Sequence, residues 1–271
     1  MAELKYKLTN DVLFKMMFVQ YPELLKRLVA GLLGVRLEDI TELAVKNPDI
    51  QPDKLGEKFC QLDINMLVDD KLVDLEIQVE DEHDYPERTV YYWARIFSGA
   101  LPERGQYSAL PQTIVISIVA FPLFRCAEYY SEFRLLEVTR HEQLTDRMCM
   151  IYFELPKLPE IAGANGELMY WLSLFKAKTE EELTKIEKEG GAIMAQAVEA
   201  YRHISASEKF KELERMRVRR LQDEASALGN AERKGENRKA IAIAKKMKAK
   251  GADISYIIEM TDLTVDDILQ L

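Results

Sequence analysis

Carboxylates alternate with apolar residues along the stretch from residue 58 to residue 82, KFCQLDINMLVDDKLVDLEIQVEDE. Asp63 lies in its first half, and Asp74, Glu76 and Gln78 lie in its second half, each flanked by apolar side chains. A period of two is typical of β-strands that bury one face. The sequence therefore predicts two neighbouring strands whose open face carries many carboxylates, the ligands that hard cations such as Mg²⁺ prefer.

A two-residue loop at residues 69–70 would fix the pairing of these strands. On that register Asp63 faces Glu76. The other polar pairs would be Asn65 with Asp74 and Gln61 with Gln78. Like charges directly opposite one another, with Cβ atoms about 4.5–5.5 Å apart, destabilise a strand pair, and a divalent cation between them would relieve the repulsion. Because Asp-Asp is not a preferred hairpin turn, a longer loop would shift this register.

Solvated charge is the simpler interpretation of the same residues, since the solvent face of a hairpin is often charged. Residues 69–87, however, contain nine acidic residues and a single lysine. That density is greater than solubility requires, and it favours a cation site.

The whole chain has 271 residues, of which 48% are hydrophobic and 31% charged, with a net charge of −9. This composition predicts a packed core, and an acidic surface would repel nucleic acid unless basic patches or metal ions intervene. The three cysteines lie far apart, which is typical of reduced thiols in the cytosol. Neither a signal peptide nor an apolar run of the ~18–20 residues that a membrane span needs is evident, so we expect a cytoplasmic protein.

The elements that would position the carboxylates follow the order helix, three strands, helix, buried strand. They are two helices within residues 8–34, a short strand at 40–47, a loop at 48–57, the hairpin, a helix at 86–101, a buried strand at 112–121, and further strand candidates at 133–140 and 146–158. This order predicts an α/β sandwich, and the pattern becomes helical and rich in charge from about residue 165.

Asp63 followed by Glu76-Ile77-Gln78 is similar to the D…(D/E)-x-K signature of the PD-(D/E)XK nuclease superfamily, with glutamine in place of lysine. The segments LTNDVLFKMMF, LDINMLVDDKLVDLEIQVE and ERTVYYWARIFSGALPERGQYSALPQTIVISIVAF resemble, in this order and spacing, the Rpn family of recombination-promoting nucleases. Rpn proteins are also described as putative transposases of that superfamily. The resemblance covers roughly residues 5–160 and implies an αβββαβ nuclease core with a mixed sheet.

The resemblance also implies a function, a Mg²⁺-dependent DNA endonuclease connected with recombination or mobile elements. Asp63 and Glu76 would hold the metal, with the Ile77 carbonyl as a further oxygen, and a metal ion of this kind activates water and stabilises charge on the phosphate. Gln78 would stand in the catalytic position of the lysine, where it can orient water but supplies neither a cation nor a useful base. This departure predicts that activity is slow.

Four further residues are secondary candidates. Asp11 lies in the segment that matches the family and would add an acid near the metal, although an acid in a first helical turn also favours the helix dipole. Arg88, Tyr92 and Arg95 share one face of the helix at 86–101, where they would contact a DNA phosphate and sugar. The alternative is that the tyrosine packs in the core and the arginines pair with nearby acids.

We expect three parts, a nuclease-like domain at residues 1–160, a helical extension at 161–234 and a small helical tail at 235–271. The tail resembles the helix-turn-helix-like tail common in this family. Residues 233–250 carry eight lysines and arginines against one glutamate, a local basic patch. The second helix of the tail begins with acids, which is unusual for a major-groove reader, so packing or self-association is the other interpretation.

DNA is the expected partner, and double-strand cleavage with one metal site per chain would favour a homodimer. A nuclease fold that is catalytically weak or inactive and binds DNA or protein is the alternative, motivated by Gln78 and the acidic charge. An acid/base pair of a glycosidase is disfavoured because the chain shows no aromatic platform for a sugar.

Overall fold

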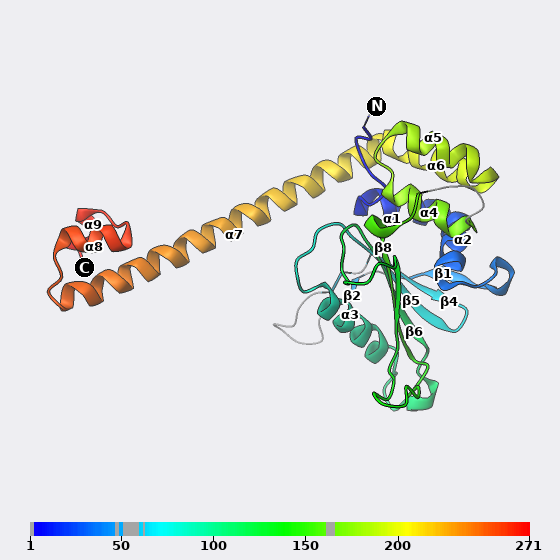
Figure 1. Ribbon diagram of the computed structural model, residues 1–271, viewed down its shortest axis with the longest axis horizontal. Coiled ribbons are helices and arrows are strands. Elements are labelled where there is room, and N and C mark those ends of the chain that lie inside the picture. Colours follow the sequence, from blue (N-terminus) through cyan, green and yellow to red (C-terminus); the bar gives the residue numbers. More distant parts are fainter. Residues whose placement is uncertain (1–2, 47–48, 51–59, 62, 161–165) are drawn as a thin grey trace. The chain divides into compact units, whose positions relative to one another are not determined.

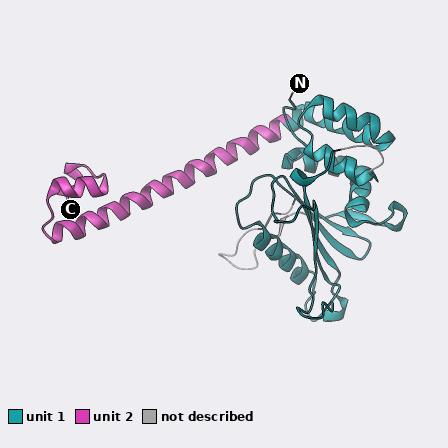
Figure 2. Cartoon of the chain, viewed as in Figure 1, with its two compact units in different colours: residues 1–210 teal, residues 211–271 magenta. Residues whose placement is uncertain are grey.

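The computed structural model describes residues 3–46, 49–50, 60–61, 63–160 and 166–271, with the backbone alone at 49–50 and 60–61. Two compact units divide the chain, one spanning residues 1–210 and the other residues 211–271 (Figure 2). Within the described ranges, none of the helices combines the length and the apolar content that crossing a membrane requires.

A six-stranded mixed sheet forms the centre of the first unit (Figure 1). Its order is β1-β4-β5-β6-β8-β7, in which β5, β6 and β8 are parallel and the other neighbours antiparallel. The strands are β1 (Leu43–Val45), β4 (Ile64–Val68), β5 (Lys71–Gln78), β6 (Thr113–Val119), β7 (Tyr130–Phe133) and β8 (Met148–Glu154), while β2 (Asp49–Ile50) and β3 (Cys60–Gln61) pair separately. Every residue of β6 is buried, as predicted for a strand at the sheet centre.

The helices of this unit begin and end at the residues that favour such ends. Asn10 Oδ1 accepts a hydrogen bond from the Leu13 N–H (3.0 Å) and caps the first helix, and Gly34 ends the second in the left-handed conformation. The helices are α1 (Asp11–Gln20), α2 (Pro22–Leu33), α3 (Tyr85–Gly99), α4 (Gly166–Lys176), α5 (Glu180–Glu189) and α6 (Gly191–Ala206), with 3₁₀ turns at Leu37–Asp39, Tyr107–Ala109 and Leu155–Lys157.

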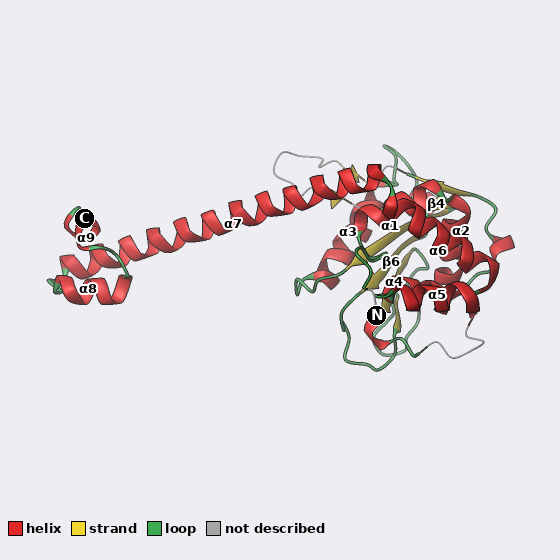
Figure 3. Cartoon of the chain, turned by 90° about the horizontal axis from the view of Figure 1, so that it is seen from above, coloured by secondary structure: helices red, strands yellow, loops and turns green. Residues whose placement is uncertain are grey.

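One face of the sheet carries the main hydrophobic core. Here β4, β5, β6 and β8 present apolar side chains to α1, α2, α4, α5 and α6, which lie on this side (Figure 3). The centre of the core is aromatic, since Phe14 and Phe18 of α1 pack with Trp171 and Phe175 of α4 at ring-centroid distances of 6.0–6.2 Å. This packing fixes α1 against the sheet.

Helix α3 covers the opposite face, and the expectation of an open carboxylate face is therefore wrong. Ile96 of α3 packs on Leu72 of β5, and the Trp93 indole N–H donates to the Thr113 carbonyl (3.1 Å). Asp74 is fully buried and Glu76 is 6% exposed. The alternating pattern identified the face correctly, but it carried no information about a helix that follows β5 and folds back over it.

The hairpin has the predicted register. Val68 pairs with Lys71 and Asn65 with Asp74, so residues 69–70 form the two-residue loop. Asp69 takes a φ of 52°, and its Oδ1 accepts hydrogen bonds from the Thr41 hydroxyl (2.6 Å) and from two backbone N–H groups, those of residues 41 and 42. Those bonds account for a turn that Asp-Asp would not favour alone.

Three expectations need correction or lie outside the described residues. The strand predicted at 133–140 is wrong beyond Phe133, where β7 ends, because the apolar residues that follow are largely exposed, Val138 at 88%, and pair only in an isolated bridge at Leu136 within the described residues. The loop predicted at 48–57 falls largely outside the described residues, and its described part, 49–50, is strand β2. The backbone of Gln61 pairs with Asp49, and the described β4–β5 ladder does not contain its predicted pairing with Gln78.

The second unit is helical. Its helices are α7 (Glu208–Ala249), which begins at the end of the first unit, α8 (Ile254–Thr261) and α9 (Val265–Leu269). Helix α7 continues through residues 234–235, where a boundary was expected. The division into 1–160, 161–234 and 235–271 stays a prediction.

Candidate active site

Asp63 and Glu76 lie together at the end of the hairpin. The Asp63 backbone N–H donates to Glu76 Oε1 (2.8 Å), and the Ile77 N–H donates to Asp63 Oδ2 (2.8 Å). Each carboxylate is thus oriented by a backbone N–H from the other side of the hairpin, directly beside the ladder that sets the register. Rigid elements of this kind position a site more accurately than loops do.

Burial raises the pKa of both acids. Burial is the main cause for Asp63, whose pKa is raised although the Lys15 ammonium opposes the shift. The pKa of Glu76 is raised to about 8, chiefly by burial and next by the charge of Asp63. The neighbouring positive charge of Lys15 does not cancel these shifts, and a divalent cation would supply further positive charge.

Asp74 is a third acid of this face that sequence reasoning placed in the hairpin but did not assign to the site. Both carboxylate oxygens of Asp74 are buried, and the side chain that hydrogen-bonds with this acid is the neighbouring Glu76 carboxyl. Burial, and then the charges of Glu76 and Asp63, raise its pKa well above the usual range. The alternating pattern of the strand could have identified it, because Asp74 and Glu76 are two residues apart and therefore share a face.

Helix α1 brings two charged residues to Asp63. Lys15 Nζ lies 3.2 Å from Asp63 Oδ1, with side chains 27% and 13% exposed respectively. The charge of Asp11 raises the pKa of Asp63, so this secondary candidate does lie near the carboxylate pair. Lys15 was missed, although it follows Asp11 by four residues and must therefore share its helix face.

Gln78 lies at the site but is engaged by protein groups at both ends of its amide. Its Oε1 accepts from Arg88 Nη2, and its Nε2 donates to the Glu80 carbonyl (2.8 Å). Arg88 in turn donates to Glu82 Oε2 (2.8 Å) and lies 4.9 Å over the ring of Tyr85. Arg88 therefore joins the end of β5 to α3.

The remaining candidates on α3 lie along the helix toward the start of β5. Tyr92 packs against Leu72 of β5 and Ile96 of α3. Leu72 lies four residues before Glu76 along the strand. Arg95 follows on the next turn and is partly exposed. The structure therefore brings Asp63, Glu76, Gln78, Asp11 and Arg88 together, whereas Tyr92 packs at the other end of the hairpin.

The donor set fits a cation that needs few protein ligands. Among the described residues, no three histidine, cysteine, aspartate or glutamate side chains converge on one point as a closed metal cage would require. Mg²⁺ is commonly held by one or two carboxylates and keeps several waters. Asp63 and Glu76 can supply such a pair.

The sequence model of the family described as PD-(D/E)XK nuclease family transposase matches residues 8–231. The match includes α1, the hairpin, α3 and the buried strand β6. The chain belongs to this family. Comparison with curated proteins and with solved structures gives no match.

Membership of the PD-(D/E)XK nuclease family transposases explains the fold. The mixed sheet with its αβββαβ core and helical C-terminal region is consistent with the nuclease fold. The family implies a nuclease function linked to mobile elements, with DNA as the substrate. PD-(D/E)XK nucleases generally use divalent metal ions, in agreement with the paired carboxylates.

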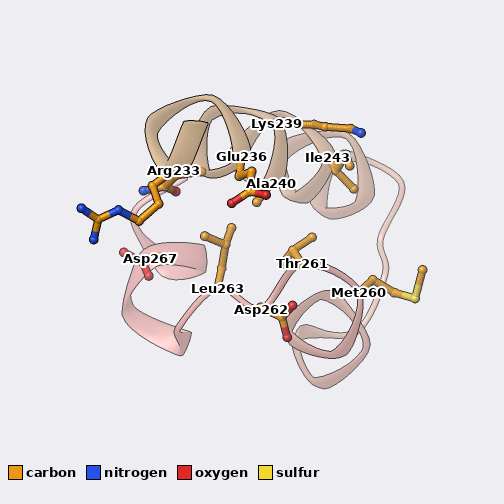
Figure 4. Close-up of a pocket in the computed structure, with 11 residues that line it drawn as sticks. Arg233, Glu236, Lys239, Ala240, Ile243, Met260, Thr261, Asp262, Leu263 and Asp267 are labelled. Carbon is orange, nitrogen blue, oxygen red and sulfur yellow. The ribbon is translucent and has the colours of Figure 1, made fainter. Parts of the chain in front are cut away.

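The tail of this family member has a small core of its own. Ala244, Ile257, Leu263 and Ile268 are buried together, and Lys248 Nζ donates to the Ile268 carbonyl (2.9 Å). A groove of about 610 Å³ lies between α7 and the α8–α9 turn, where Glu236 and Ala240 of α7 approach Leu263 (Figure 4). Its lining mixes both signs of charge, with Arg233 and Lys239 beside Glu236, Asp262 and Asp267. This lining singles out no ligand.

Proposed function

We propose that this chain is a Mg²⁺-dependent DNA endonuclease of the Rpn type, which hydrolyses phosphodiester bonds in connection with recombination or mobile elements. One observation carries the proposal. Asp63 and Glu76, which the resemblance assigns to the family's signature, accept hydrogen bonds from backbone N–H groups across the hairpin, and burial raises the pKa of each. A carboxylate pair of this kind is destabilising unless a cation completes it.

Asp63 and Glu76 would hold the ion. A bound Mg²⁺ supplies Lewis-acid chemistry, because it lowers the pKa of water and neutralises charge on the phosphate. The role of this chain is to keep the two acids within the ladder and to place Asp11 beside them. Arg88, which is 19% exposed at its side chain, holds Gln78 in place from α3.

DNA binding by an acidic chain needs local positive charge. The basic residues of 233–250 offer such charge, and Arg88 and Arg95 offer it on α3. Double-strand cleavage with one site per chain favours a homodimer. The widely spaced cysteines support a cytoplasmic location as part of the same proposal.

A plasmid-nicking assay tests the proposal. Wild type is compared with Asp63→Ala and Glu76→Ala in Mg²⁺, Mn²⁺, Ca²⁺ or EDTA, and conversion of supercoiled plasmid to nicked and linear forms is followed over time. We expect cutting in Mg²⁺ or Mn²⁺, none in EDTA, and a loss of at least about 100-fold in both variants, as is typical when a group that stabilises transition-state charge is removed.

Glu142→Ala is the matched control, since it removes a carboxylate that is 73% exposed at its side chain and far along the chain from the hairpin. It should cut like the wild type. Folded wild type that leaves plasmid intact in every metal, beside a nuclease that cuts under the same conditions, would contradict the proposal.

A catalytically weak or inactive module that binds DNA or protein is the second candidate. It is favoured by Gln78, whose amide is occupied by Arg88 and the Glu80 carbonyl and therefore does not present a free group to water. This candidate predicts that DNA binding, measured by fluorescence anisotropy, survives Asp63→Ala unchanged while no variant and no metal gives cutting.

A further inference from the structure

The position of the signature lysine presents a chemical difficulty in this chain. Glutamine at position 78 carries no charge, and both ends of its amide already bond to the protein. Arg88, which holds Gln78, is itself shared between Gln78 and Glu82. Neither side chain is arranged to present a positive charge to a water beside Asp63.

Lys15 is arranged to do so. Its ammonium lies 3.2 Å from Asp63 Oδ1, the oxygen that does not accept the Ile77 N–H. Its side chain is 27% exposed, so the charge lies where the buried carboxylates meet solvent. A substrate phosphate would have to approach from that side, because the strands and α3 bury Glu76 elsewhere.

The position of Lys15 is fixed by the core of the first unit. Asn10 caps α1 one residue before it begins, and Phe14 and Phe18 bury this helix against α4. Lys15 follows Phe14 directly, so the packing that buries the phenylalanine also sets the direction of the lysine. The ammonium thus belongs to a rigid element, as a catalytic group should.

We propose that Lys15, supplied by α1, takes the part of the missing signature lysine and holds the attacking water beside Asp63 against the scissile phosphate. This inference rests on the proposed nuclease function. In hydrolysis the water oxygen forms a bond to phosphorus and the bond from phosphorus to the leaving sugar oxygen breaks. The water gives up one proton to solvent, and the leaving oxygen takes one from solvent. Lys15 stays protonated and donates hydrogen bonds to the water and to the phosphate oxygen that gains charge.

The simpler alternative is a purely electrostatic role, in which Lys15 only neutralises Asp63 in the metal-free protein. The two roles differ once metal is bound. A neutralising lysine becomes dispensable at saturating metal, and its removal would even favour metal binding. A lysine that holds water and phosphate is needed most under those conditions.

The experiment measures single-turnover plasmid cutting at saturating Mg²⁺ for wild type, Lys15→Met, Lys15→Arg and Lys15→Gln. Mn²⁺ binding by titration calorimetry and thermal unfolding are measured on the same samples. Lys7→Met is the control, since it removes an exposed lysine from the segment just before α1. We expect Lys15→Met to cut about 100-fold more slowly while binding Mn²⁺ at least as tightly as the wild type.

Lys15→Arg keeps the charge and should retain more activity than Lys15→Gln, which keeps only a hydrogen-bonding group. If Lys15→Met does not fold, the comparison of Lys15→Arg with Lys15→Gln tests the proposal. Cutting by Lys15→Met within about threefold of the wild type, or equal cutting by Lys15→Arg and Lys15→Gln, overturns the role of Lys15 and leaves the nuclease proposal intact. Wild type that binds Mn²⁺ but never cuts overturns both.

Discussion

One face of the β4-β5-β6-β8 sheet packs an apolar core against five helices, whereas the opposite face buries carboxylates and hydroxyls under the single helix α3. Both faces come from the same strands, because alternate residues point to opposite sides. On β5, Val73, Leu75 and Ile77 point into the core, while Asp74 and Glu76 point toward α3.

The two faces differ in what their burial contributes. Burying an apolar side chain stabilises the fold under all ordinary solution conditions, at roughly 1.5–3 kcal/mol for a large aliphatic residue. Burying a carboxylate costs free energy unless a proton, a partner or a metal ion neutralises it. The apolar face therefore holds the fold together, and the α3 face retains a destabilising arrangement that is explained by the chemistry it serves.

Phe14→Ala should have the largest effect on stability, because it acts on the apolar face. The side chain is fully buried against Phe18 and Phe175, and its loss leaves a cavity that should lower the free energy of unfolding by about 3–5 kcal/mol. Urea denaturation measures the change. The loss should be the same at pH 5 and pH 8 and with or without Mg²⁺, and a strong dependence on either would break the distinction between the faces.

Stability of the metal-free protein should fall as pH rises from about 5 to about 8. The pKa of Glu76 is raised from the ordinary 4.5 to about 8, so in this window the folded state keeps a proton that the unfolded state has released. Raising the pH therefore favours unfolding, by on the order of 2–4 kcal/mol across the window. The pKa of Asp63 and of Asp74 is raised as well, which acts in the same direction.

Urea denaturation in EDTA at several pH values measures this slope, and saturating Mg²⁺ should flatten it because a cation replaces the proton. Glu76→Gln should flatten it without metal. A metal-free protein that becomes more stable between pH 5 and pH 8 would show that the α3 face does not hold its acids protonated.

Asp74→Asn should stabilise the metal-free protein by about 1–2 kcal/mol near pH 8. The amide has nearly the shape of the acid, carries no charge at any pH, and can donate a hydrogen bond to Glu76. Thermal unfolding in EDTA measures the change. Asp70→Asn makes the same substitution at the exposed hairpin loop and should stay within about 0.5 kcal/mol of the wild type. Destabilisation by Asp74→Asn would mean that the acid has a structural partner.

The sequence predicted these two faces unequally. Alternation and a two-residue loop were sufficient for the register, because a one-residue slip would bury the wrong set of side chains. The apolar run of β6 located the sheet centre for a similar reason, since such a run must be covered on both sides. Helix ends such as those at Asn10 and Gly34 depend on local chemistry that needs no tertiary information.

Features that depend on distant segments were beyond the same reasoning. The burial of Glu76 depends on α3, and the place of Lys15 depends on how α1 packs through Phe14, so neither follows from the hairpin alone. The strand expected at 133–140 failed because its apolar residues suggested a partner strand that the chain does not provide there. Local patterns give faces and ends, whereas the neighbours that cover a face come from the rest of the fold.

Tyr152→Phe should have the smallest effect on the free energy of unfolding. It tests whether hydrogen bonds between uncharged side chains stabilise the α3 face. The Tyr152 hydroxyl lies 2.5 Å from Thr89 Oγ1, and the Thr89 hydroxyl also lies 2.8 Å from the Pro86 carbonyl oxygen, so the tyrosine belongs to a buried hydrogen-bonded group that reaches α3. Removing its hydroxyl should lower the free energy of unfolding by about 1 kcal/mol, the usual net value of one buried hydrogen bond. Tyr107→Phe, at a side chain that is 80% exposed, is the control and should change little. Because this bond joins α3 to β8 without involving an acid, its loss should be independent of Mg²⁺, in contrast to every change at Asp63, Asp74 or Glu76.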